Sequence, residues 1–179
     1  MSSKRLAVLP AALASIVAVA ACGGSSGGGK SVRLVAYSTP QAAFAALIPA
    51  FQGTAAGKGV TFSQSYGASG DQSRAVLAGL PADVVDLSLE PDVTKLVAAG
   101  LVPAAWNANP THGFVTDSVA VFLVRKGNPK HIQTWDDLVR PGVTVLTPNP
   151  FSSGSARWNV MAAYGSKLTE GDTPAQAQA

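Results

Sequence analysis

The hydrophobic and polar positions after residue 30 alternate between strand-like and helix-like segments. Period-two alternation and short apolar runs predict strands over 32–37, 60–66, 83–89, 119–125 and 143–147. Helical spacing predicts helices between them, over 40–51, 70–79, 91–99, 134–137 and 153–167. Residues 171–179 are small and polar and are expected to be unstructured. Strands that alternate with helices predict an α/β domain with a largely parallel sheet.

Individual residues mark several helix ends. Pro40 suits the first position of a helix, whereas Pro49 lies inside the apolar face and is expected to kink or shorten it. Gly100 is typical of a helix C-terminus. Thr134 is expected to cap the short helix that carries Asp136 and Asp137 in its first turn.

The first 30 residues have a different pattern, which is typical of export. Lys4 and Arg5 precede an apolar run over 6–20, and small residues lead directly to Cys22. This arrangement resembles a bacterial lipobox, so we expect a signal peptide over 1–21 and a lipid on Cys22. Glycine and serine over 23–29 predict a flexible tether, and 22–30 is assigned to the anchor. An ordinary cleaved secretory signal and an uncleaved single-span anchor are the alternatives.

Composition excludes several classes of function. The chain has 13 basic and 10 acidic residues, and loss of Lys4 and Arg5 with a signal peptide would leave it nearly neutral. The charges are scattered, so no nucleic-acid partner is expected. With Cys22 acylated, no thiol would remain for a disulfide. His112 and His131 lie in separate loop-like stretches, so neither a zinc site nor any other cofactor is expected.

Three loops share one design, in which a strand ends, small polar residues follow and a helix begins. They cover 37–40, 67–71 and 151–155. The first turn of a helix has backbone N–H groups without partners and a partial positive charge, so such loops can bind oxyanions. Each loop taken alone also fits an ordinary turn with an N-cap.

The same loops lack the marks of an enzyme. No G-x-S-x-G or Walker motif occurs, and Arg74 and Arg157 lie about one helical turn downstream of the loops. A surface-anchored serine hydrolase could use Ser69 or Ser153, but both histidines look remote from them. We therefore expect a binding protein rather than an enzyme.

Several motifs, in order, resemble the sulfate-binding proteins of bacterial sulfate ABC importers. They are Ser-Tyr-Gly-Ala-Ser-Gly-Asp-Gln at 65–72, Val-Arg-Lys-Gly-Asn-Pro-Lys at 124–130, and Thr-Pro-Asn-Pro with Ser-Ser-Gly-Ser-Ala-Arg-Trp-Asn over 147–159. The resemblance runs from about residue 32 to 167. It implies the type II periplasmic-binding-protein architecture, in which two α/β lobes close on an anion. Lobe 1 is assigned to 31–115, the start of lobe 2 to 116–179, and the hinge to about 113–118.

The resemblance also implies which residues bind the anion. Ser69 matches the ligand-contacting serine of the first glycine-serine loop, and Ser153 and Gly154 match the contacts of the third. Ser155 stands where the family usually has a second glycine. Ser38 stands where relatives often carry aspartate, and the family contact there is largely through the backbone N–H. A site made of donors suits fully ionised sulfate better than hydrogen phosphate, whose proton needs an acceptor.

The implied function is capture of sulfate, or thiosulfate, outside the cytoplasm and delivery to the permease subunits of an ABC importer. We expect a monomer held by its lipid at the outer face of the cell membrane or in the periplasm. Molybdate and phosphate are less favoured ligands. Family members are roughly twice this length, so we expect this chain to contain only the beginning of the second lobe. Sheet edges and apolar faces would then be uncovered, and sulfate binding is expected to be weak or absent. A non-functional remnant of such a protein is the alternative.

Overall fold

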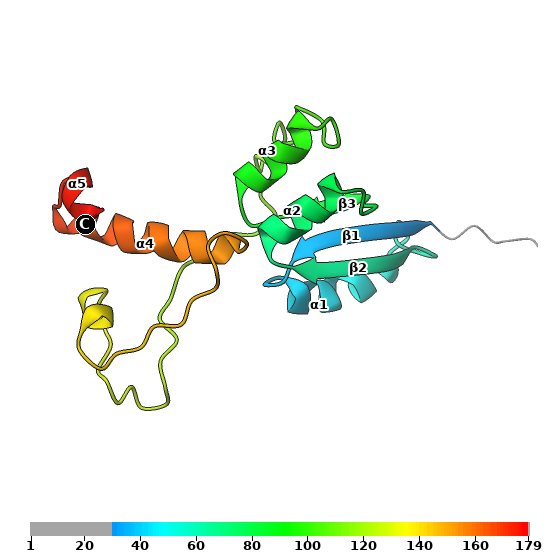
Figure 1. Cartoon of the computed structure of the whole chain (residues 1–179). Helices are drawn as coiled ribbons and strands as arrows, with labels where there is room; N and C mark the ends of the chain where they lie inside the picture. The colour runs from blue at the N-terminus through cyan, green and yellow to red at the C-terminus, as the bar shows by residue number, and fades with distance from the viewer. Residues whose placement is uncertain (1–29, 179) are drawn as a thin grey trace, which may run out of the picture.

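The computed structural model describes residues 30–178 and contains a three-stranded parallel sheet. The strands are β1 (Ser31–Tyr37), β2 (Thr61–Gly67) and β3 (Val84–Asp86), in the order β2-β1-β3. Because all three strands run the same way, their carboxyl ends lie at one edge of the sheet (Figure 1). The α/β class with a parallel sheet is confirmed.

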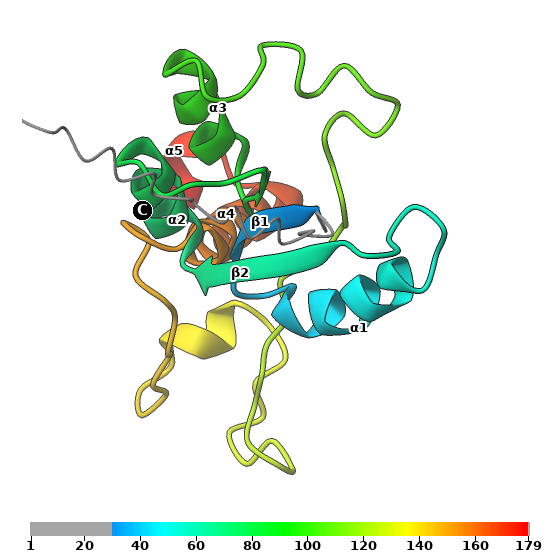
Figure 2. The ribbon, with the colours of Figure 1, turned by 90° about the vertical axis from the view of Figure 1, so that its right-hand side faces the viewer.

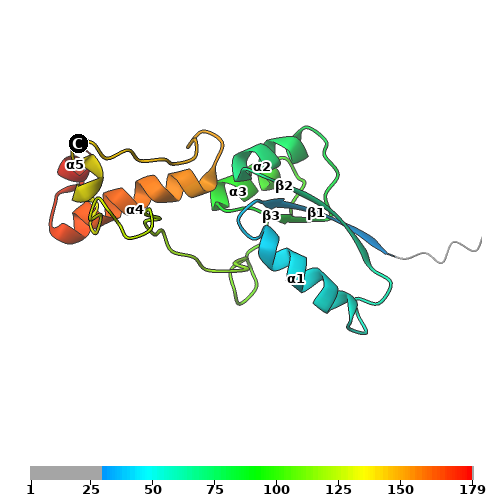
Figure 3. The ribbon, with the colours of Figure 1, turned by 90° about the horizontal axis from the view of Figure 1, so that it is seen from below.

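Helices cover both faces of the sheet. The helix α1 (Gln41–Gln52) lies on one face, and α2 (Ser69–Leu77) and α3 (Glu90–Ala98) lie on the other (Figures 2 and 3). The long helix α4 (Gly154–Glu170) begins beside α2 and extends away from the sheet, and the short α5 (Pro174–Ala177) follows it (Figure 1). A short 3₁₀-helix, η1 (Asp136–Val139), lies in the long connection between α3 and α4.

The core is small and is centred on β1. Leu34 and Ala36 of β1 are buried against Ile48 of α1, because alternate strand residues face the same helix. Partly buried aromatic side chains complete this layer, namely Phe44, Phe62 and Tyr66. On the opposite side of the sheet, Val35 is buried, and α3 buries Leu96 completely. These two thin layers hold the carboxyl edge of the sheet in place.

The strands expected over 119–125 and 143–147 do not form. Both segments are long irregular loops that run well away from the sheet (Figure 1). Their apolar side chains are exposed, as Leu123 (99%) and Leu146 (93%) show. An apolar strand requires a neighbouring strand for its backbone and a packed layer for its side chains, and the described residues supply neither here. The exposure of these apolar residues agrees with the expected uncovered faces.

Smaller differences occur at the helix ends. Thr134 does not cap η1: the carboxylate of Asp137 instead accepts from the N–H groups of Gln133 (2.7 Å) and Thr134 (2.8 Å). These two hydrogen bonds lower the pKa of Asp137. The expected unstructured tail contains α5, which Thr173 and Gln176 stabilise through a capping box.

One further boundary was wrong by a few residues, and another was right. The predicted strand over 83–89 is shorter, because β3 pairs with β1 only from Val84 to Asp86. Pro49 lies inside α1, which ends at Gln52, within one residue of the predicted end.

The expectations for the N-terminal segment lie outside the described residues. They concern the signal peptide over 1–21, lipidation of Cys22 and most of the tether. Among the helices of residues 30–178, none has both the length and the apolar character needed to cross a membrane.

Candidate anion site at two helix N-termini

The first half of the candidate site is the N-terminus of α2. Ser69 is the first residue of α2 and is 2% exposed. Its Oγ donates to Oδ2 of Asp92 (2.8 Å) and accepts from the N–H of Ser88 (3.0 Å). Its hydroxyl proton is therefore already used, and its backbone N–H, which has no intrahelical partner, is the donor that remains for a ligand.

A buried acid fixes this loop. Asp92 of α3 is fully buried, and its Oδ1 lies 3.0 Å from Nζ of Lys95. Ser73 of α2 donates to the carbonyl oxygen of Asp92 (2.7 Å). A buried carboxylate is tolerated only when it is paired and hydrogen-bonded. Asp92 therefore holds α2 to α3 and sets the position of Ser69.

The second half of the site is the N-terminus of α4. Ser153 is the N-cap, and its Oγ accepts from the N–H of Ala156 (3.3 Å). The hydroxyl proton of Ser153 therefore remains available to a ligand. Gly154 and Ser155 open the helix, and for their N–H groups we find no acceptor within residues 30–178. These three residues present donors side by side.

Direct contacts join the two halves. The N–H of Gly70 donates to the carbonyl oxygen of Ser152 (3.0 Å), and the indole N–H of Trp158 donates to the carbonyl oxygen of Ser88 (2.9 Å). Gly154 packs so closely on this turn that a Cβ there would lie 1.8 Å from Oγ of Ser88. The N-termini of α2 and α4 therefore meet, and each contributes about half a positive charge.

The expected contact at Ser38 is only partly available. Ser38 follows β1 at the same carboxyl edge of the sheet and is exposed. Its N–H donates to the carbonyl oxygen of Gly67 (2.9 Å), and its own carbonyl accepts from Gln41 (3.2 Å). A contact through the N–H of Ser38 would require exchange of the bond to Gly67. Its role therefore stays a prediction.

The two nearby arginine side chains already have hydrogen-bond partners, although Nη1 of Arg74 lies close to the junction, 3.4 Å from where a Cβ on Gly70 would be. Arg74 pairs with Asp71 on the exposed surface of α2, and Nε of Arg157 donates to the carbonyl oxygen of Pro150 (2.8 Å). The donors without a partner at the two helix N-termini, among the described residues, are therefore backbone N–H groups and the hydroxyl of Ser153.

Two titratable groups near the carboxyl edge of the sheet have raised pKa values. Burial raises the pKa of Asp86, the last residue of β3. Burial, and then the charge of Asp86, raise the pKa of Tyr66. Across residues 30–178, no cluster of three or more histidine, cysteine or acidic side chains could hold a metal ion.

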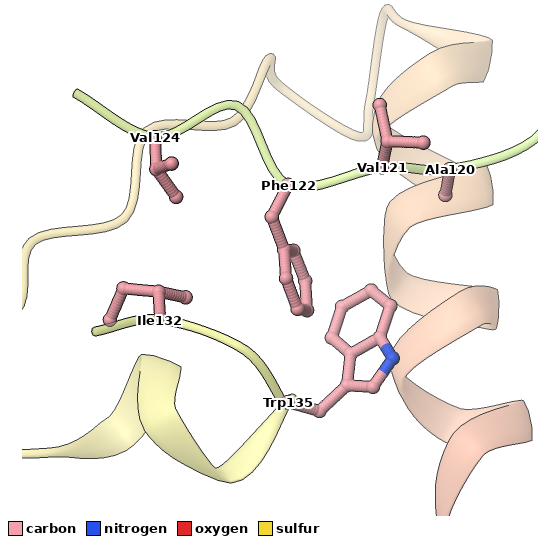
Figure 4. Close-up of a pocket in the computed structure, with 6 residues that line it drawn as sticks. All are labelled: Ala120, Val121, Phe122, Val124, Ile132 and Trp135. Carbon is pink, nitrogen blue, oxygen red and sulfur yellow. The ribbon is translucent and has the colours of Figure 1, made fainter. Parts of the chain in front are cut away.

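A separate apolar groove of about 410 Å³ lies between the irregular segment near residue 122 and η1 (Figure 4). Its lining includes Phe122 and Trp135, whose ring centroids lie 4.8 Å apart at 77°. The groove shares no residue with the two helix N-termini. It is a small satellite cluster and not part of the candidate site.

Sequence reasoning found the serine and glycine residues of the loops but assigned no role to three residues that organise them. Ser88, Asp92 and Trp158 come from the β3–α3 turn, from α3 and from the second turn of α4. An aspartate in the first turn of a helix usually interacts with the helix dipole at the surface, so its burial gave no sequence signal. The hydrogen bond between Trp158 and Ser88 depends on a tertiary contact, so it has no sequence signal either.

Comparison with known proteins gives the family. Residues 32–175 match the bacterial extracellular solute-binding protein family. The chain is 45% identical over 177 residues to a sulfate-binding protein of Synechococcus elongatus, covering 93% of this chain and 51% of that protein. It is 43% identical over 135 residues to a thiosulfate-binding protein of Escherichia coli, covering 72% and 40% respectively.

A solved structure agrees with these sequence comparisons. The sulfate-binding protein SubI from Mycobacterium tuberculosis H37Rv is 50% identical and superposes with a TM-score of 0.80, over 83% of this chain and 52% of that chain. The fold is therefore that of the periplasmic binding proteins. The chain spans about half the length of the curated relatives it matches. It belongs to the bacterial extracellular solute-binding protein family, whose members bind solutes for transport.

Proposed function

We infer that this chain captures sulfate, or the similar anion thiosulfate, outside the cytoplasm for delivery to an ABC importer. The observation that carries this proposal is the meeting of two helix N-termini, fixed by the hydrogen bond from Gly70 to Ser152. Aligned N–H groups and positive dipole ends are suited to a tetrahedral oxyanion. The relatives named for sulfate and thiosulfate binding support the same class of ligand.

The donors proposed to contact the anion are the N–H groups of Ser69, Gly154 and Ser155 and the hydroxyl of Ser153. Sulfate carries no proton at neutral pH, so all of its oxygens accept hydrogen bonds. A set of protein groups that only donate therefore places no acceptor against a sulfate oxygen. Each hydrogen bond to a charged group contributes roughly 1.5–3 kcal/mol. Millimolar affinity requires about 4 kcal/mol and micromolar affinity about 8 kcal/mol. Four such donors, less the cost of ordering the ligand, favour the weak, millimolar end of this range, in agreement with the weak binding expected from the sequence.

The proposal extends to the location and partners of the chain. The sequence pattern before residue 30 supports a signal peptide and a lipid on Cys22, which would hold a monomer at the outer face of the cell membrane or in the periplasm. Permease subunits of an importer are the proposed macromolecular partner. The lobe boundary near residue 115, with a hinge over 113–118, is part of the same proposal. Ser38 is proposed as an outer contact of the anion.

An amide-resolved NMR titration of the full chain with sodium sulfate tests the proposal. The N–H resonances of Ser69, Gly154 and Ser155 should shift together and give one dissociation constant. Sodium chloride at matched ionic strength is the control and should leave these resonances unchanged. Absence of any sulfate-dependent shift at these residues would overturn the proposed function.

The serine hydrolase alternative has no support in the geometry. The hydroxyl of Ser69 donates a hydrogen bond to Asp92 and accepts one from the N–H of Ser88. The hydroxyl of Ser153 caps α4. In the described part of the chain, neither His112 nor His131 makes a side-chain hydrogen bond to these serines. A nucleophilic serine requires such a base.

A further inference from the structure

Ser88 lies in the turn between β3 and α3 and links the two halves of the site. Its N–H donates to Oγ of Ser69 (3.0 Å), at the start of α2. Its carbonyl oxygen accepts from the indole N–H of Trp158 (2.9 Å), in α4. The backbone of Ser88 is thus used completely, and it holds the two helix N-termini together.

The side chain of Ser88 is different. Its Oγ is buried, and no hydrogen-bond partner is found for it among the described residues. It lies against the first residue of α4, since a Cβ on Gly154 would be 1.8 Å from this oxygen. Buried polar groups in folded proteins are nearly always paired, and an unpaired one costs free energy. An alanine would fill this position without that cost.

The unpaired hydroxyl lies next to Gly154 at the α4 N-terminus, and residues 30–178 supply no acceptor for the N–H of Gly154 either. A hydroxyl can donate one hydrogen bond, and an anion oxygen on the Gly154 N–H would lie next to it. We propose that Ser88 is a further anion-binding residue, whose hydroxyl donates to the tetrahedral oxyanion held at the N-terminus of α4. This inference rests on the proposed function and names a residue that sets the affinity of the site for the anion.

If Ser88 binds the anion, removal of its hydroxyl should weaken sulfate binding without lowering the stability of the ligand-free chain. Without ligand, Ser88→Ala removes an unsatisfied group, so the unfolding temperature should stay the same or rise. With ligand, the variant loses one hydrogen bond to a charged partner, so the dissociation constant should rise about 10- to 100-fold. A residue needed only for packing would not raise the dissociation constant while leaving stability unchanged.

Ser73 is a matched control. It is also a fully buried serine, but its Oγ donates to the carbonyl oxygen of Asp92 (2.7 Å) and makes no hydrogen bond to α4 in the described part of the chain. Ser73→Ala should therefore lower the unfolding temperature and leave the sulfate affinity of the folded chain within about twofold.

The experiment is an NMR titration of the full chain with sodium sulfate, combined with thermal unfolding followed by circular dichroism. Ser88→Ala and Ser88→Gly, which both lack the hydroxyl, should show the same weakened binding. The inference is overturned if both variants bind sulfate within twofold of the unmodified chain. It is also overturned if Ser88→Ala loses as much thermal stability as Ser73→Ala. An unmodified chain that does not bind sulfate overturns the proposed function itself, which distinguishes the two failures.

Discussion

The N–H of Gly70 and the carbonyl oxygen of Ser152 are 3.0 Å apart, which fixes the start of α2 beside the start of α4. This backbone hydrogen bond brings together two loops that lie far apart in the sequence. It involves no side chain, but a Cβ on Gly70 would lie 3.0 Å from the same carbonyl oxygen, so this close backbone approach favours glycine at position 70. The alignment of donors in the site therefore follows from chain geometry.

Gly154 should tolerate no side chain. A Cβ would lie 1.8 Å from Oγ of Ser88 and 3.0 Å from Cγ of Leu89, so Gly154→Ala should cost about 1–3 kcal/mol of stability through overpacking. Gly165→Ala in the same helix is the control, because nothing lies within 4 Å of its added Cβ. It should gain about 0.5–1 kcal/mol from helix propensity. Urea unfolding measures both, and equal effects would contradict the close approach.

Trp158 should stabilise the junction through its indole N–H. Trp158→Phe keeps an aromatic ring but removes the donor to the carbonyl oxygen of Ser88, and it should cost about 0.5–1.5 kcal/mol. Thermal unfolding gives the stability change, and the sulfate titration gives the accompanying loss of affinity. Unchanged stability in Trp158→Phe would show that the 2.9 Å hydrogen bond does not hold the helices together.

Asp92 should be the most sensitive acid in the described part of the chain. Asp92→Ala leaves the buried hydroxyl of Ser69 without its acceptor and removes the partner of Lys95, so a loss of about 2–4 kcal/mol is expected. Asp71→Ala breaks the exposed pair with Arg74 and should cost under about 1 kcal/mol. Chemical denaturation compares the two, and similar losses would argue against a structural role for the buried carboxylate.

Asp83 should make stability depend on pH in the acid range. The side chain of Arg33, followed by its backbone N–H, lowers the pKa of Asp83 to about 2. A lowered folded-state pKa contributes stability that is present above the unfolded value of about 3.9 and is lost as the pH falls through about 2. Asp83→Asn should therefore flatten the dependence between about pH 4 and 2.

Asp86 should act in the opposite direction. Burial raises its pKa, so the charged form costs stability at neutral pH and protonation relieves that cost. Asp86→Asn should accordingly raise the unfolding temperature at pH 7. Unfolding temperatures measured between pH 2 and 7 test the predictions for both acids.

For Asp83, identical dependence of the unfolding temperature on pH in the unmodified chain and in Asp83→Asn would rule out the ion pair with Arg33 as the cause.

The sequence predicted best where local pattern and tertiary structure agree. Alternation of side chains over 32–37 and 60–66 and the apolar face near Phe44 gave β1, β2 and α1 within a few residues. Gly154 and its neighbours were found because small polar residues at a helix start have a local signature. These features depend on few contacts beyond their own segment.

The remaining features depend on contacts that a sequence pattern does not specify. The apolar run at 119–125 has strand propensity, but Leu123 is almost completely exposed because no strand within residues 30–178 pairs with it. The burial of Asp92 and the unpaired hydroxyl of Ser88 arise where α2, α3 and α4 meet. Neither has a periodicity or spacing that could reveal it.

The central claim is that backbone N–H groups, rather than guanidinium groups, capture the anion. Arg74 and Arg157 are the cationic residues closest in sequence to the proposed donors, and both already interact with other groups. A sulfate titration of the Arg74→Gln/Arg157→Gln double variant, beside the unmodified chain, tests this most directly. We predict dissociation constants within about threefold of one another. A loss of 100-fold or more in a variant that remains folded would contradict the account.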